Sequence, residues 1–88
     1  MVSKKVKVIN PQGLHMRPAQ LFVTEMNKYK SEVSTVFNGK PINAKSIMNV
    51  LASCIKQGSE IEIQCTGEQE AEALAAAVKL VESGLGDM

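Results

Sequence analysis

The chain has 88 residues, 44% of them hydrophobic, and a formal net charge of +1. This length allows one small domain spanning residues 1–88, and the near-neutral charge and scarcity of aromatic residues argue against nucleic acid as a direct partner. No apolar run approaches membrane-spanning length and no signal-peptide pattern precedes the polar first residues, so we expect a cytoplasmic protein without membrane insertion.

The first predicted element is a half-buried strand from Lys4 to Asn10, because Val6 and Val8 alternate with polar residues. Pro11 and Gly13 then break the alternation and predict a loop. This loop leads directly into the segment that carries the only histidine of the chain.

A helix is predicted to begin at about residues 15 to 17. Its apolar residues follow the i, i+3, i+4, i+7 spacing of one helical face: Ala19, Phe22, Val23 and Met26. Pro18 fits such a helix only in its first turn, where the missing N–H has no partner to lose. His15 is therefore expected at or near the N-cap.

A hairpin of two strands follows this helix. The strands are predicted from Val33 to Phe37 and from Lys40 to Asn43, and Asn38-Gly39 between them favours a type I′ turn. Because Pro41 cannot donate to a ladder, we expect the second strand to lie at a sheet edge.

The next two predicted elements are a short helix and a strand. Ser46 is the expected N-cap of the helix, which continues to Ile55. The strand runs from Glu60 to Thr66, and its alternation predicts one solvent-exposed face and one buried face. The buried face would carry Ile61, Ile63 and Cys65.

The last predicted helix begins near Glu68, has an acidic first turn and ends before Gly84. Its expected core face consists of Ala71, Leu74, Ala75, Val78 and either Val81 or Leu85. The element order βαββαβα predicts an α+β fold of two layers, with mostly antiparallel strands and the helices stacked on one face of the sheet.

Residues suited to phosphate chemistry gather where the first helix begins. The imidazole of His15 is a nucleophile near neutral pH, and Arg17 supplies a permanent cation. The backbone N–H groups of Met16 and Arg17 lie at the positive end of the helix dipole and are candidate ligands for phosphoryl oxygens, whereas Pro18 has no N–H. The alternative interpretation is an ordinary surface or capping histidine beside a solvated arginine.

The two cysteines, Cys54 and Cys65, lack the spacing of redox or zinc motifs. We therefore expect two reduced core residues and no metal site.

The segment from Gly13 to Ala19 resembles the phosphorylation-site signature of HPr, the histidine-containing phosphocarrier family of the bacterial phosphoenolpyruvate:sugar phosphotransferase system. The resemblance extends over essentially the whole chain, including the Asn38–Lys40 turn, the segments Lys45–Met48 and Gly58–Ile61 and an alanine-rich last helix. It implies an open-faced β-sandwich, in which three helices cover one face of a four-stranded antiparallel sheet.

The resemblance also implies a function without a cofactor. Enzyme I would pass a phosphoryl group to Nδ1 of His15, and the carrier, a transiently docking monomer rather than an enzyme, would donate it to the IIA components of sugar permeases. Arg17 would neutralise the phosphoryl charge. In many members of the family, HPr kinase/phosphorylase phosphorylates the serine matched by Ser46, and this form is the corepressor of a catabolite control protein.

The expected partner surface consists of Ile47, Met48 and Leu51, with Met48 exposed. For the other two residues, an ordinary place in the core fits equally well. The chain departs from the usual family pattern at four positions, whose effect on partner choice the sequence leaves open: Gln12, Met16, Asn49 and Cys54.

Two other classes of function compete with the phosphocarrier hypothesis. One is a regulatory binding module that acts mainly through phosphorylated Ser46, although paralogues of that kind typically lack the histidine that this chain keeps as His15. The other is a generic α/β interaction domain whose resemblance to the family is accidental.

Overall fold

The computed structural model of the chain describes residues 1–11 and 13–85. Its elements follow the predicted order: β1 (Val2–Lys7), α1 (Met16–Met26), β2 (Glu32–Phe37), β3 (Lys40–Asn43), α2 (Ile47–Ala52), β4 (Glu60–Thr66) and α3 (Glu70–Glu82). No helix in these two ranges is long and apolar enough to cross a membrane.

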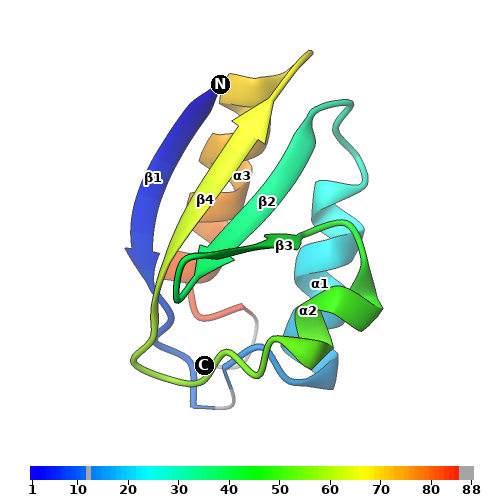
Figure 1. The fold of residues 1–88 in the computed structure, drawn as a ribbon. Coiled ribbons are helices and arrows are strands. Elements are labelled where there is room, and N and C mark those ends of the chain that lie inside the picture. The colour runs from blue at the N-terminus through cyan, green and yellow to red at the C-terminus, as the bar shows by residue number, and fades with distance from the viewer. Residues whose placement is uncertain (12, 86–88) are drawn as a thin grey trace.

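The four strands form one antiparallel sheet in the order β1-β4-β2-β3. Helices α1 and α3 lie behind the sheet in Figure 1, and no helix formed by the described residues covers the other face of the sheet. The predicted fold, an open-faced sandwich of the α+β class, is confirmed. Strand β3 lies at an edge, as Pro41 predicted.

Strand β4 explains why the sheet has one buried face. Ile61, Ile63 and Cys65 are at most 1% exposed, whereas the alternate residues of the strand contact solvent. Each side chain in an extended strand points to the face opposite its neighbour's, so this alternation turns every second residue of β4 toward the helices. The predicted burial of this strand is confirmed.

The hairpin between β2 and β3 closes as predicted. Asn38 and Gly39 have φ values of 53° and 77°. Two successive residues in the left-handed region are the requirement of a type I′ turn, which matches the twist of the strands it joins.

The buried face of α3 differs from the predicted one. Ala73, Ala77 and Val81 are fully buried at i, i+4 and i+8, whereas Ala71 and Ala75 are exposed. Val78 is buried as predicted, both alternatives Val81 and Leu85 are buried, and Leu74 is half-buried. Alanine occurs on several sides of this helix, so hydrophobicity alone does not distinguish one stripe from the next.

Several predicted boundaries also shift. Strand β1 begins earlier and ends at Lys7, α2 ends at Ala52 instead of Ile55, and α3 begins at Glu70 instead of near Glu68. The acidic first turn of α3 therefore consists of Glu70 and Glu72. Local turn geometry, which hydrophobic periodicity does not encode, sets each of these ends.

Candidate functional site at the start of helix α1

His15 is the N-cap of α1. Its backbone is extended, with φ −73° and ψ −176°, and the N–H of Ala19 donates to its carbonyl oxygen over 2.8 Å, which closes the first helical turn. Pro18 is buried in that turn. The helix therefore begins where the position of Pro18 predicted.

The side chain of His15 is exposed and makes no capping hydrogen bond to the helix. Serine, threonine or asparagine at an N-cap commonly accepts a hydrogen bond from the helix backbone, whereas here the first-turn donors are not used in this way. The side chain of His15 is therefore exposed to solvent without a bond to the helix, and its ring can bind a group from outside.

Two backbone donors lie beside the ring. The N–H groups of Met16 and Arg17 belong to the first helical turn, which offers no intrahelical acceptor, and Pro18 supplies no donor. Arg17 is exposed and lines a shallow hollow together with Pro11, His15 and Met16. A nucleophilic ring, two N–H groups of the first helical turn and a permanent positive charge thus lie at one open surface, which suits a phosphoryl group.

The loop before His15 is anchored to the segment that follows α2. The N–H of Leu14 donates to the carbonyl oxygen of Ile55 over 2.9 Å, and buried Asn10 donates from Nδ2 to the carbonyl oxygen of Gly13 over 2.7 Å. Gly13 has φ 59°, and a Cβ there would lie 2.4 Å from the Ile55 oxygen. The sequence placed Gly13 in a loop and in the family signature, but no sequence pattern indicated its close approach to Ile55 or the hydrogen bond from Asn10.

Ser46 is the N-cap of α2, as predicted. It is half-buried, and its Oγ accepts a hydrogen bond from the N–H of Asn49 over 3.4 Å. Asn27, the C-cap of α1, donates from Nδ2 to the carbonyl oxygen of Lys45 over 3.2 Å. Ser46 thus lies near the end of α1, whereas His15 lies at its start, so the structure does not bring the two residues together.

The residues of the expected partner surface differ in exposure. Met48 is 75% exposed, as predicted. Ile47 and Leu51 are partly buried and pack against the core, so each combines core contact with some exposed surface.

The prediction of two core cysteines is half wrong. Cys65 is buried, and this burial raises the pKa of its thiol. Cys54 is exposed, because the chain turns there with φ 55° and leaves α2. It lines a small hollow with His15 and Leu51, and so belongs to the surface around the histidine.

Of the four departures from the family pattern, Met16 and Asn49 are also exposed. Gln12 lies outside the described residues. In the part of the chain that the structure describes, no three or more His, Cys, Asp or Glu side chains gather closely enough to hold a metal ion.

Comparisons with known proteins agree with this geometry. Residues 2–83 match the family described as the PTS HPr component phosphorylation site. The chain is 43% identical to the phosphocarrier protein HPr of Buchnera aphidicola subsp. Acyrthosiphon pisum (strain APS), an alignment of 74 residues that covers 84% of this chain and 87% of the relative.

A second relative is an HPr-like protein with another name, Crh. The chain is 45% identical to the HPr-like protein Crh of Bacillus subtilis (strain 168), with the same coverage of 84% and 87%. Among solved structures, a crystal structure of HPr from Thermoanaerobacter tengcongensis superposes with a TM-score of 0.96 at 36% identity, covering 100% of this chain and 99% of the other.

Proposed function

The chain belongs to the HPr family of phosphocarrier proteins, and on this premise we propose that His15 is the residue that carries the phosphoryl group. Phospho-enzyme I is the proposed donor, and the IIA components of sugar permeases are the proposed acceptors. The observation that carries the proposal is the exposed ring of His15 at the N-cap of α1, free of a capping hydrogen bond and next to Arg17.

In the proposed step, Nδ1 of His15 attacks the phosphorus atom. A P–N bond forms while the bond from phosphorus to the donor breaks, and the donor keeps that electron pair. The N–H groups of Met16 and Arg17 bind the phosphoryl oxygens, and the guanidinium of Arg17 neutralises part of their charge.

The strength of these contacts suits a carrier that must release its cargo. A helix N-terminus stabilises an exposed anion by only about 0.3 to 1 kcal/mol. The surface around His15 is open, so water competes for the phosphoryl oxygens. The phosphorylated state is therefore favoured without becoming a trap.

Phosphotransfer from enzyme I tests the proposal. Incubation with enzyme I and phosphoenolpyruvate should add one acid-labile phosphate per chain, and His15→Ala should abolish it. Ser46→Ala is the matched control, because it removes a hydroxyl from α2 and leaves α1 intact; it should accept phosphate at the normal rate. Labelling of His15→Ala at the level of the unmodified protein would contradict the proposal.

A regulatory function through Ser46 is the second candidate. The similarity to HPr-like protein Crh and the half-buried hydroxyl of Ser46 at the start of α2 favour it. HPr kinase/phosphorylase and a catabolite control protein are the partners that this function requires. Met48, exposed on the same helix, would belong to the docking surface for both functions, together with Ile47 and Leu51.

The two candidates predict opposite phenotypes. If His15 carries phosphate to permeases, His15→Ala should prevent growth on a transported sugar, and Ser46→Ala should affect only repression by preferred carbon sources. Normal growth of His15→Ala, together with lost repression in Ser46→Ala, would favour the regulatory function alone.

A further inference from the structure

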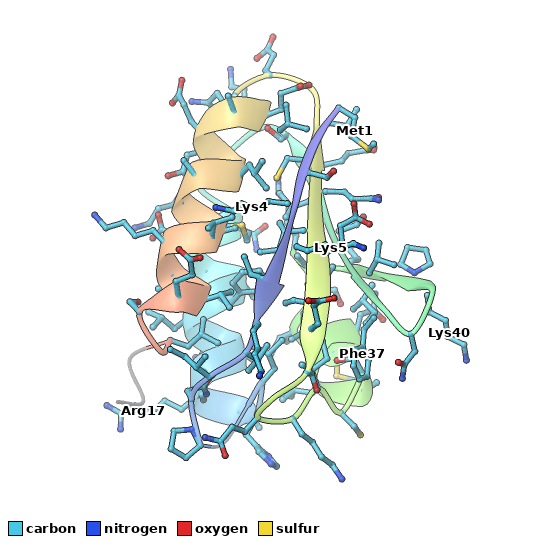
Figure 2. The ribbon with its side chains drawn as sticks, turned by 90° about the vertical axis from the view of Figure 1, so that its left-hand side faces the viewer. Met1, Lys4, Lys5, Arg17, Phe37 and Lys40 are labelled. Carbon is cyan, nitrogen blue, oxygen red and sulfur yellow. The ribbon has the colours of Figure 1, made fainter. Side chains whose placement is uncertain are left out.

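Strand β1 forms one edge of the sheet. It pairs with β4 on one side, and no strand among the described residues pairs with it on the other. Figure 2 views the molecule from this side, with β1 in front and α3 beside it. An exposed edge strand is a template for pairing with another extended segment.

The backbone of β1 has donors and acceptors on its free side. Just beyond the strand, Val8 directs both its N–H and its C=O toward the β4 side, with hydrogen bonds to Ser59 and from Gly58 of 2.8 and 2.7 Å. Backbone direction alternates along a strand, so Ser3, Lys5 and Lys7 direct their N–H and C=O groups toward the free side. A pairing segment would find these groups available.

An apolar groove lies next to the same edge, on the helix side of the sheet. Its floor consists of Val2 on β1 and of the side chains of α3 that proved not to be buried: Ala71, Leu74 and Ala75. Three charged side chains also line the groove, two of them basic and one acidic: Lys4, Lys79 and Glu82. None of these residues lines the hollows beside His15.

The open face of β1 carries the lysines Lys5 and Lys7, each beside a glutamate of β4. The register places Lys5 opposite Glu62 and Lys7 opposite Glu60, whereas Val6 lies opposite Ile61. In Figure 2, Lys4 points toward α3 and Lys5 points away from it. On its paired side, β1 therefore already associates with a strand that alternates acidic and apolar residues.

We propose that the free edge of β1 binds an extended segment of a partner protein in which acidic and apolar residues alternate. The segment adds a fifth strand to the sheet. Its apolar side chains cover the groove between β1 and α3, and its acidic side chains lie beside Lys5 and Lys7. Backbone hydrogen bonds provide affinity, and this alternation provides specificity.

A second copy of the chain fits this edge less well. Two β1 strands paired around a two-fold axis would bring the lysines of one strand close to those of the other, and like charges across a strand pair are destabilising. An acidic segment meets the same lysines with opposite charge.

The test uses the whole, unphosphorylated chain and the peptide acetyl-Thr-Glu-Val-Glu-Val-Glu-Thr-amide. Titration followed by amide NMR should shift the signals of Ser3, Lys5 and Lys7 and of α3 residues around Leu74. The same peptide with its glutamates replaced by lysines should not bind. Equal binding of the two peptides, or shifts confined to β3 at the opposite edge, would overturn the proposal.

Two variants of the chain separate the backbone and charge contributions. Ser3→Pro removes one free-side N–H without changing charge and should abolish binding, whereas Ser3→Val should retain it. Lys5→Gln with Lys7→Gln should weaken binding about two- to thirtyfold. The control Lys28→Gln with Lys40→Gln makes the same charge change elsewhere and should leave binding unchanged.

Each remaining outcome also decides the proposal. Unaltered peptide affinity in Ser3→Pro would show that no strand is added and would overturn it. Concentration-dependent dimerisation through β1, measured by sedimentation, would assign the edge to a second copy instead. The phosphotransfer assay should be unaffected by Ser3→Pro, so failure here is distinguishable from failure of the proposed function.

Discussion

Substitution of Gly13 by alanine should be much more costly than the same substitution at Gly39. Both glycines have positive φ, 59° and 77°, so alanine is strained at each of them. Their surroundings differ. A Cβ at Gly13 would lie 2.4 Å from the carbonyl oxygen of Ile55 and 2.8 Å from Cα of Lys56, whereas a Cβ at Gly39 would meet nothing within 4 Å.

The two environments predict the size of the difference. An L-residue in the left-handed region costs about 1 to 2 kcal/mol, and this term is common to both variants. Because the obstruction at Gly13 is backbone, which cannot rotate away, the loop must move off the Ile55 segment. That movement adds an overpacking cost of about 1 to 3 kcal/mol and loses the hydrogen bond from Leu14 to Ile55, worth about 1 kcal/mol. Gly13→Ala should therefore lose about 2 to 4 kcal/mol more than Gly39→Ala.

Urea denaturation of the two variants measures this difference, since an unchanged slope with a lower midpoint reports a loss of stability. The rate of phosphate transfer to His15 should also fall in Gly13→Ala and stay unchanged in Gly39→Ala, because only the first loop positions the histidine. Equal losses of stability in the two variants would refute the argument that close approach to Ile55, rather than backbone strain, makes glycine necessary at position 13.

Three further predictions concern the Thr35 hydroxyl, the two cysteines and the Glu70 carboxyl. Thr35→Val should raise the free energy of unfolding by about 1 kcal/mol, because the buried Thr35 hydroxyl has no hydrogen-bond partner among the described residues; a loss of stability in thermal melts would contradict this. A thiol reagent should label Cys54 in the native protein and Cys65 only after unfolding, which mass spectrometry of quenched samples measures; equal rates would contradict the burial of Cys65. The hydrogen bond from the Gly67 N–H lowers the pKa of Glu70 below its ordinary value of 4.5. The ionised Glu70 carboxylate therefore stabilises the fold above that pH, and this contribution is lost as pH falls below it. Glu70→Gln should therefore flatten the acid side of the stability profile, and an unchanged profile would contradict this.

Hydrophobic alternation and turn chemistry predicted most of the fold. The alternation in β4 is compatible with only one orientation of the strand, since a shift of one residue in register would turn Ile61 and Ile63 to solvent. The sequence of α3 is compatible with several orientations of the helix, because its alanines allow neighbouring stripes to be buried at similar free energy. Packing against the whole sheet determines that Ala73 and Ala77 are the buried residues. The sequence of the helix by itself does not predict which stripe is buried.

In the candidate site, too, some features follow from the local sequence and others only from the tertiary structure. His15, Pro18 and the helix start follow from local rules of helix termini, so the sequence located them. The contact of Gly13 with Ile55, and the place of Cys54 beside the histidine, join segments about forty residues apart. Such contacts depend on the tertiary arrangement of α1 and α2, which periodicity along one element does not specify.

The arrangement of α1 and α2 limits how a charge on Ser46 can affect His15. The start of α2 lies near the end of α1, and the segment after α2 lies beside His15, so the two residues are separated by about the length of α1. Eleven residues of helix span about 16 Å. In water, two charges on a phosphoserine would act on one charge at that distance with only about 0.5 kcal/mol. Physiological salt reduces this further, since its Debye length is about 8 Å. A larger effect of Ser46 phosphorylation on transfer must therefore arise from partners that dock on α2, where the phosphate would lie within the interface.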